Sequence, residues 1–125
     1  MARPRAATQD SLASSPRPGA QPRRNQHVLA KVFPIKLKDG NQAKAEAIVA
    51  AFAPKGPGTE DGTLSFRVYR DPNNVDYLLF VEHFADQAAY DAHTGSDVYR
   101  ELIAGQFAEL IMEFVEIDHE LIASV

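Results

Sequence analysis

The chain has 125 residues, 45% of them hydrophobic and 24% charged, a composition typical of one ordinary globular domain. It contains no cysteine, so disulfides, thiolate nucleophiles and cysteine-ligated metals are excluded, and a reducing compartment such as the cytoplasm is expected. No apolar run approaches the roughly 18 residues that a membrane-spanning helix needs, so we expect no membrane contact.

Charge divides the chain into two parts. Residues 1–26 hold five arginines and one aspartate, a net charge of +4, together with four prolines. We expect a disordered extension, because such a segment buries too little apolar surface to offset its chain entropy. An Arg-rich, acid-poor start also resembles an organelle transit peptide. Residues 27–125 hold eight basic and sixteen acidic residues, a net charge of −8, so this expected single domain is a poor nucleic-acid binder.

The first half of the domain is predicted to form a strand, a helix and a hairpin. Residues 27–35 predict a strand, with Pro34 at an edge or at its end. A helix follows Gly40, with apolar residues spaced by three and four positions, and residues 53–62 are a Pro- and Gly-rich loop. The strand at residues 63–70 and the strand that begins at Val75 flank a Pro-containing turn, so they form a hairpin.

A second helical region, residues 86–110, and a last strand, residues 112–122, complete the domain. Asp86 can cap the start of the helix, and Gly95 is expected to break it, with Ser96 capping the second part. The apolar positions of that second part share one face: Tyr99, Ile103, Phe107 and Leu110.

The order βαββαβ predicts a ferredoxin-like α+β fold, a four-stranded antiparallel sheet with both helices on one face. Both faces of the third strand are apolar: Tyr77, Leu79 and Val81 point one way, and Leu78, Phe80 and Phe84 the other. A large uncovered apolar face is rare on a monomer, so we expect a homodimer that packs sheet against sheet, a dimeric α+β barrel. The alternative is a monomer with a lightly apolar outer face.

Glu82 and His93 are the candidate catalytic residues. Glu82 interrupts the apolar row between Phe80 and Phe84, where partial burial would raise its pKa and make it a better base. It could equally be a structural acid that a helix N-terminus or an arginine satisfies. His93 could accept a proton from a bound phenol or enol, or it could cap the last helical carbonyls before Gly95.

Aromatic residues suggest a ligand pocket between the sheet and its helices. Phe33, Phe66, Phe80 and Phe84 would together suit a flat apolar ligand, although each ring could simply pack the core. Tyr90 precedes His93 by three positions, so the two can jointly anchor a substrate oxygen, with Tyr99 as a further candidate. The four scattered histidines do not form a metal site, and no Gly-rich phosphate cradle precedes a helix.

Several short motifs occur in an order that resembles the antibiotic biosynthesis monooxygenase family over nearly all of residues 27–122. The motifs are Lys38-Asp39-Gly40, the segment 62–66, Arg70-Asp71-Pro72, Val81-Glu82 with Phe84, and Ala92-His93 followed by Ser96. The resemblance implies the dimeric α+β barrel. The family that it points to includes oxygenases that act on quinols and anthrones without metal or flavin. Such enzymes deprotonate a phenol or enol, and the carbanion then gives an electron to O₂. His93 and Glu82 would be base and orienter, and no cofactor would be needed.

The haem-degrading branch of the family is not matched. Phe33 stands where that branch has an asparagine, Arg100-Glu101-Leu102 lack its histidine, and Phe84 stands where many members have tryptophan. The leading hypothesis is a cofactor-independent monooxygenase of a small aromatic, quinol or anthrone-like substrate. The alternatives are a non-catalytic dimeric small-ligand-binding or stress-response domain and a proton-transfer isomerase of the same superfamily.

Overall fold

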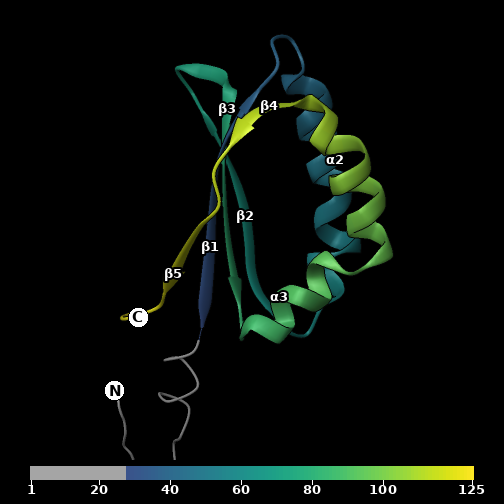
Figure 1. Cartoon of the computed structure of the whole chain (residues 1–125). Coiled ribbons are helices and arrows are strands. Elements are labelled where there is room, and N and C mark those ends of the chain that lie inside the picture. Colours follow the sequence, from purple (N-terminus) through teal and green to yellow (C-terminus); the bar gives the residue numbers. More distant parts are fainter. Residues whose placement is uncertain (1–27) are drawn as a thin grey trace, which may run out of the picture.

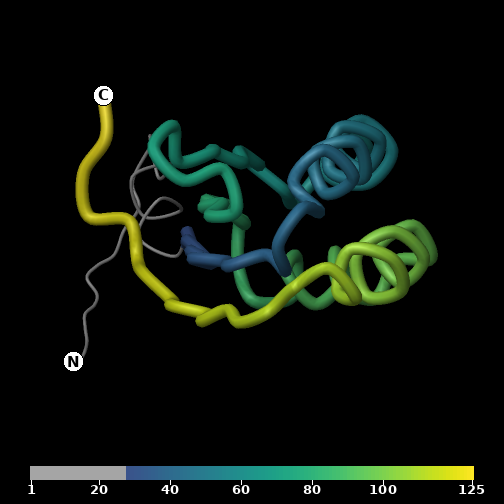
Figure 2. The backbone as a smooth tube through the Cα atoms, turned by 90° about the horizontal axis from the view of Figure 1, so that it is seen from above, coloured from purple at the N-terminus to yellow at the C-terminus, as the bar shows by residue number. Residues whose placement is uncertain are grey.

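The computed structural model describes residues 28–125, and the extension expected at residues 1–26 lies outside that range. The chain forms one antiparallel sheet and one layer of helices, in the order that the sequence predicts (Figure 1). Seen from above, both helical segments lie on the same side of the sheet (Figure 2). The prediction of a ferredoxin-like α+β fold is confirmed.

Five strands make up the sheet: β1 (Leu29–Leu37), β2 (Thr63–Asp71), β3 (Asn74–Phe84), β4 (Ile111–Phe114) and β5 (Ile117–Glu120). Their order is β2-β3-β1-β4, and β5 continues the edge of β4 by pairing with the other half of β1. The β2–β3 hairpin and the β1–β3 pair give the sheet its longest ladders. β1 and β3 are therefore central strands, and residues on their helix-facing side are shielded from water.

Pro34 lies in the middle of β1, so the prediction that it marks an edge or the end of a strand is wrong. Its carbonyl accepts a hydrogen bond from the N–H of Val115 (3.2 Å). In a strand the N–H and C=O of one residue point the same way, so the missing N–H of Pro34 would face this edge. The edge of the sheet next to Pro34 is interrupted between β4 and β5. The single last strand expected over residues 112–122 is therefore divided into two short strands.

The first helix, α2 (Gln42–Lys55), begins after Gly40, which has a left-handed φ of 80°. Its predicted apolar face is the buried one: Ala45, Ile48, Val49 and Phe52. The helix continues through Pro54, and a short 3₁₀ turn, η1 (Pro57–Thr59), follows. The loop expected at residues 53–62 is therefore partly helical.

The second helical region is interrupted near the predicted place. α3 (Gln87–Thr94) begins where the Asp86 side chain accepts a hydrogen bond from the N–H of Ala89 (2.9 Å), and it ends at Gly95. Ser96 Oγ then accepts the N–H of Tyr99 (3.2 Å). The following helix is not a regular α-helix: η2 (Tyr99–Gln106) has the wider π-helical turn and η3 (Phe107–Leu110) the tighter 3₁₀ turn.

A continuous core fills the space between the sheet and the helices. Its buried members come from β1, α2, β3 and η3: Ile35, Leu37, Ala45, Ile48, Val49, Leu78, Phe80, Phe107 and Leu110. Within residues 28–125, no helix has both the length and the apolar character that crossing a membrane requires.

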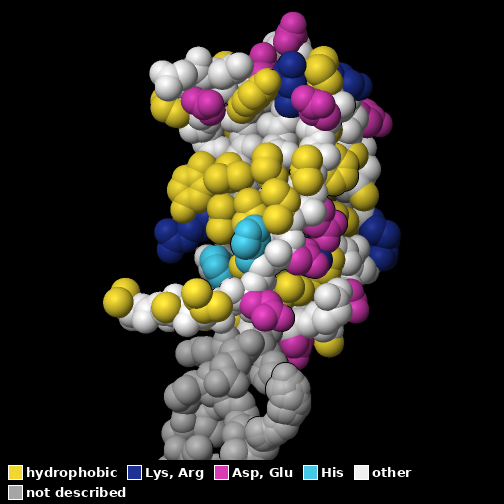
Figure 3. Space-filling view, turned by 60° about the vertical axis from the view of Figure 1, so that its left-hand side comes forward, with side chains coloured by type: hydrophobic (Ala, Val, Ile, Leu, Met, Phe, Trp, Pro, Cys, Tyr) yellow, Lys and Arg dark blue, Asp and Glu magenta, His cyan; other side chains and the backbone are white. Residues whose placement is uncertain are grey.

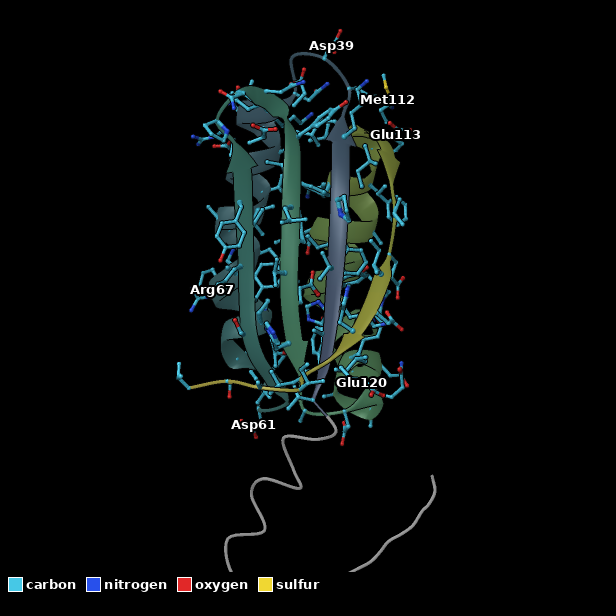
Figure 4. All side chains as sticks on the ribbon, turned by 90° about the vertical axis from the view of Figure 1, so that its left-hand side faces the viewer. Asp39, Asp61, Arg67, Met112, Glu113 and Glu120 are labelled. Atoms are coloured by element: carbon cyan, nitrogen blue, oxygen red, sulfur yellow. The ribbon has the colours of Figure 1, made fainter. Side chains whose placement is uncertain are left out.

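In the part of the chain that the structure describes, no helix covers the other face of the sheet. In the side-on surface view, apolar side chains gather on this face over the middle of the strands (Figure 3). Figure 4 looks straight at it, with β2, β3, β1 and β4 side by side and the side chain of Arg67 on the outermost strand. Tyr77 and Leu79 are 40% and 37% exposed, so the predicted outward row of β3 is confirmed.

Candidate functional site

A cavity of about 150 Å³ lies between the sheet and the helical layer. Six phenylalanine rings from both layers contribute to its wall: Phe33, Phe52, Phe66, Phe80, Phe107 and Phe114. Four polar side chains form one end: Glu82, Tyr90, His93 and Tyr99. Such a combination of an apolar wall with a few converging polar groups is typical of a small-molecule site.

His93 points inward from the last turn of α3 and is only 2% exposed. The ring packs at edge or tilted angles against Phe84, Tyr99 and Phe52, with centroid distances of 5.1, 5.3 and 5.6 Å. Nδ1 lies 2.8 Å from Oε1 of Glu60, within hydrogen-bond distance. The ring is therefore directed into the domain and not onto the helix-terminal carbonyls, which was the alternative that the sequence left open.

Glu60 is a site residue that the sequence did not single out. It follows η1 on the loop before β2, and its carboxylate also accepts a hydrogen bond from the Thr63 hydroxyl (2.7 Å). Nothing in the periodicity of residues 53–62 marks this position, because the loop has no repeating pattern. Its partner His93 stands 33 residues further along the chain, and only the packing of α3 against the loop joins them.

Glu82 is 5% exposed on the helix-facing side of β3, as expected from its place between Phe80 and Phe84. Burial, together with the negative charges of Glu116 and Glu60, raises the pKa of its carboxyl from 4.5 to about 8. At pH 7 the folded protein thus holds Glu82 mainly as the neutral acid. Its Oε1 is 3.8 Å from Nε2 of His93, longer than a hydrogen bond, so both groups can meet a ligand oxygen.

Lys31 is a second buried charge near the site, and it lies opposite Glu82 in the β1–β3 register. Only 3% exposed, it forms ion pairs with Glu116 (2.7 Å), which precedes β5, and with Asp118 (2.8 Å), which lies within it. Burial opposes its charge, but the two carboxylates prevail and raise its pKa. The burial of Lys31 could have been predicted from the sequence, because alternation along β1 places it on the helix-facing side together with Leu29 and Phe33.

The two tyrosines of the site keep their protons at neutral pH. Burial and the charge of Glu116 raise the pKa of Tyr90 to about 12, and burial with the charge of Glu82 raises the pKa of Tyr99. The ammonium of Lys31 lies 4.2 Å from the centre of the Tyr90 ring, over its face. Tyr90 and His93 are neighbours with a centroid distance of 6.3 Å, as their spacing on the helix predicts. Both phenols can therefore donate hydrogen bonds to a ligand oxygen.

The predicted site residues separate into two groups. Most of them surround one cavity: Glu82, His93, Tyr90, Tyr99, Phe33, Phe66 and Phe80. Phe84 does not line it, and that expectation is wrong, because the fully buried ring stands behind His93 and Tyr90 with centroid distances of 5.1 Å to each. Among residues 28–125, no group of three or more acidic, histidine or cysteine side chains is placed to hold a metal ion.

The family model for antibiotic biosynthesis monooxygenase matches residues 29–105, which include β1, β2, β3, α3 and most of the cavity wall. The chain belongs to the antibiotic biosynthesis monooxygenase family. Three histidine- or carboxylate-bearing positions of the site, Glu60, Glu82 and His93, lie inside the matched region. No curated protein matches the sequence.

Solved structures of the same fold come from distant organisms. A protein from Bacteroides thetaiotaomicron, provisionally described as an antibiotic biosynthesis monooxygenase, is 15% identical, with 79% of this chain and 93% of that chain covered and a TM-score of 0.74. One from Caulobacter crescentus with the same provisional description is 19% identical (78% and 92% covered, TM-score 0.71). A conserved protein from Methanosarcina mazei is 17% identical (78% and 95% covered, TM-score 0.71). At these identities the likeness shows the shared fold of the antibiotic biosynthesis monooxygenase family.

Proposed function

We propose that this member of the family is a cofactor-independent monooxygenase that oxidises a small phenol or quinol with O₂. One observation carries the proposal: the imidazole Nε2 of His93 and the carboxyl of Glu82, whose pKa is raised by burial, lie 3.8 Å apart at the polar end of an aromatic-lined cavity. A base beside a neutral acid can take a proton from a phenol and hold the resulting anion.

The chemistry needs no partner beyond O₂. Nε2 of His93 removes the phenolic proton, and the electron-rich anion gives one electron to O₂, which becomes superoxide. The two radicals combine at a ring carbon to form a peroxide anion, which takes back the proton from His93. The resulting hydroperoxide loses water and leaves a quinone. In sum, a phenol and O₂ give a quinone and water. The phenylalanine rings reduce the contact of the anion with bulk water, and Tyr90 or Tyr99 can donate a hydrogen bond to its oxygen.

The volume of the cavity favours a single-ring substrate. A dry cavity of about 150 Å³ lined by apolar side chains is large enough for benzene. The cavity here has that volume and carries polar groups at one end, so a phenol or hydroquinone fits better than a three-ring anthrone. A polycyclic substrate would require the phenylalanine rings to move apart.

We also propose that the protein works as a homodimer joined through the uncovered sheet face. Two rows of mainly apolar side chains cross this face: Tyr69, Leu79 and Pro34 in one, and Arg67, Val81, Val32 and Ile117 in the other. A second copy placed on these rows would leave the cavity of each subunit under its own helices.

Oxygen uptake with hydroquinone, 1-naphthol and anthrone tests the proposed reaction. We expect the single-ring substrate to be oxidised fastest. His93→Ala and Glu82→Ala should each lower the rate by ~10²–10⁴-fold, the usual contribution of a positioned acid or base. His119→Ala, which removes a histidine from the uncovered face, is the matched control and should leave the rate unchanged.

The outcome separates the alternative functions. Binding of the phenols without any oxygen uptake would indicate a non-catalytic binding domain, and proton exchange on an enol without uptake would indicate an isomerase. Rates of both site variants within about twofold of wild type would remove His93 and Glu82 from the mechanism.

A further inference from the structure

Glu60 holds one specific nitrogen of the His93 ring. Its Oε1 lies 2.8 Å from Nδ1, while Nε2 faces Glu82 at 3.8 Å across the polar end of the cavity. A carboxylate accepts hydrogen bonds and cannot donate them, so this contact requires a proton on Nδ1. In a neutral ring the lone pair is then on Nε2, the nitrogen turned towards the cavity.

Glu60 is itself held in place from the start of β2. The hydroxyl of Thr63 donates to the same carboxylate oxygen (2.7 Å), and the N–H of Thr63 reaches the Glu60 carbonyl (3.3 Å). The loop is attached to β3 through the hydrogen bond from the N–H of Ala85 to the carbonyl of Gly62 (2.8 Å). The carboxylate therefore cannot leave the imidazole without breaking contacts that also fix the loop.

We propose that Glu60 is a positioning residue, which fixes His93 as its Nδ1–H tautomer and presents Nε2 to the cavity as a proton acceptor. The rings of Phe52, Phe84 and Tyr99 complete the arrangement, because they pack against the imidazole from three directions. The inference rests on the proposed function only for the consequence that Nε2 acts as a base. The tautomer itself does not depend on any reaction.

Nitrogen NMR of the full chain labelled with ¹⁵N-histidine measures the tautomer directly. Long-range ¹H–¹⁵N spectra near neutral pH should give a protonated-type shift for Nδ1 of His93 and an unprotonated-type shift for Nε2. The signals are assigned by their loss in His93→Ala. A wild-type ring that carries its proton on Nε2, or an imidazolium with protons on both nitrogens, would overturn the proposal.

Variants of the loop test the role of Glu60 against a purely structural one. In Glu60→Ala the Nδ1–H pattern should give way to the Nε2–H pattern, and Asp61→Ala, which removes the adjacent exposed carboxylate, should leave it unchanged. Figure 4 places Asp61 beyond the lower end of β2, away from the sheet. Glu60→Gln keeps the shape of the side chain and serves if Ala does not fold; its amide can accept or donate, so Nδ1–H should fall to a partial population.

Turnover supplies a second readout. We expect Glu60→Ala to lower kcat by about 10- to 100-fold with KM within about twofold, the range seen when a group that orients a histidine is removed. An unchanged His93 spectrum in Glu60→Ala would refute the positioning role. A changed spectrum in a wild-type protein that takes up no oxygen would instead uphold the role of Glu60 and count against the proposed monooxygenase.

Discussion

The carboxyl of Glu82 illustrates how a single buried residue sets both chemistry and stability. In the folded protein it is 5% exposed, and its pKa of about 8 lies far above the ordinary 4.5. The folded state therefore retains a proton that the unfolded chain loses between these two values. By linkage, the contribution of Glu82 to the free energy of unfolding is greatest below about pH 4.5 and falls as pH rises towards 8.

We predict that Glu82→Gln, a neutral side chain of the same shape, removes this loss. Since one pKa unit corresponds to about 1.4 kcal/mol, the free energy of unfolding of the wild type should fall relative to that of the variant by up to about 5 kcal/mol between pH 4.5 and 8. Urea denaturation at both ends of this range measures the difference. Glu101→Gln, at an exposed position of η2, is the control, and equal pH profiles for Glu82→Gln and wild type would contradict the assignment.

Sequence alone located some of these residues and missed others for a physical reason. Glu82 and His93 stand inside periodic segments, so alternation along a strand and spacing along a helix place them. Lys31 also stands in a periodic row, and a charge at such a position signals burial with partners. Glu60 lies on a loop, where no period exists, and its pairing with His93 depends on tertiary packing alone.

At the scale of elements, the strands and α2 were predictable from hydrophobic alternation and periodicity, whereas the irregular parts were not. The π-helical turn of η2 shares the apolar stripe of an α-helix, so Tyr99 and Ile103 give no sign of it. The interruption between β4 and β5 lies beside Pro34, which contacts Val115 although the two residues are far apart in the sequence. Such details depend on contacts between segments that are far apart in the chain, and local sequence patterns do not record them.

The loop before β2 and the helix α3 meet at an unusually close approach. A Cβ atom on Gly62 would lie 2.5 Å from the Cβ of Ala89, closer than any real contact. Only glycine at this position lets α3 lie against the start of β2, and this packing brings His93 to Glu60.

We therefore predict that Gly62→Ala destabilises the fold by about 1–3 kcal/mol, the usual effect of overpacking. The distance from Glu60 to His93 should also increase, which the His93 nitrogen spectrum would register. Restoring the space with Gly62→Ala/Ala89→Gly should recover part of the loss, although glycine inside a helix costs about 1 kcal/mol relative to alanine. Urea denaturation of the three variants measures the coupling, and strictly additive effects would show that the two positions do not interact.

At the scale of the whole molecule, the two faces of the sheet differ in what covers them. The helical layer covers one face, while the other leaves Tyr69, Tyr77 and Leu79 between 37% and 48% exposed. Figure 3 shows apolar side chains gathered on this face, over the middle of the sheet. His83, opposite Ala30 in the register, has a buried Nδ1 without a hydrogen-bond partner among residues 28–125. An exposed patch of this kind is typical of a surface that a second subunit covers.

We predict a homodimer with a solution mass of twice the 13.7 kDa of the chain, measured by light scattering after size exclusion. Leu79→Glu places a charge in the centre of the patch and should give monomers, because an unpaired charge at a buried interface costs several kcal/mol. Ala47→Glu adds the same charge on the solvent side of α2, and it should leave the dimer intact. The cavity lies under the helices, so Leu79→Glu monomers that still bind phenol would show that each subunit holds a complete site. A wild-type protein that is monomeric at micromolar concentration would contradict the dimer and leave the apolar face without an explanation.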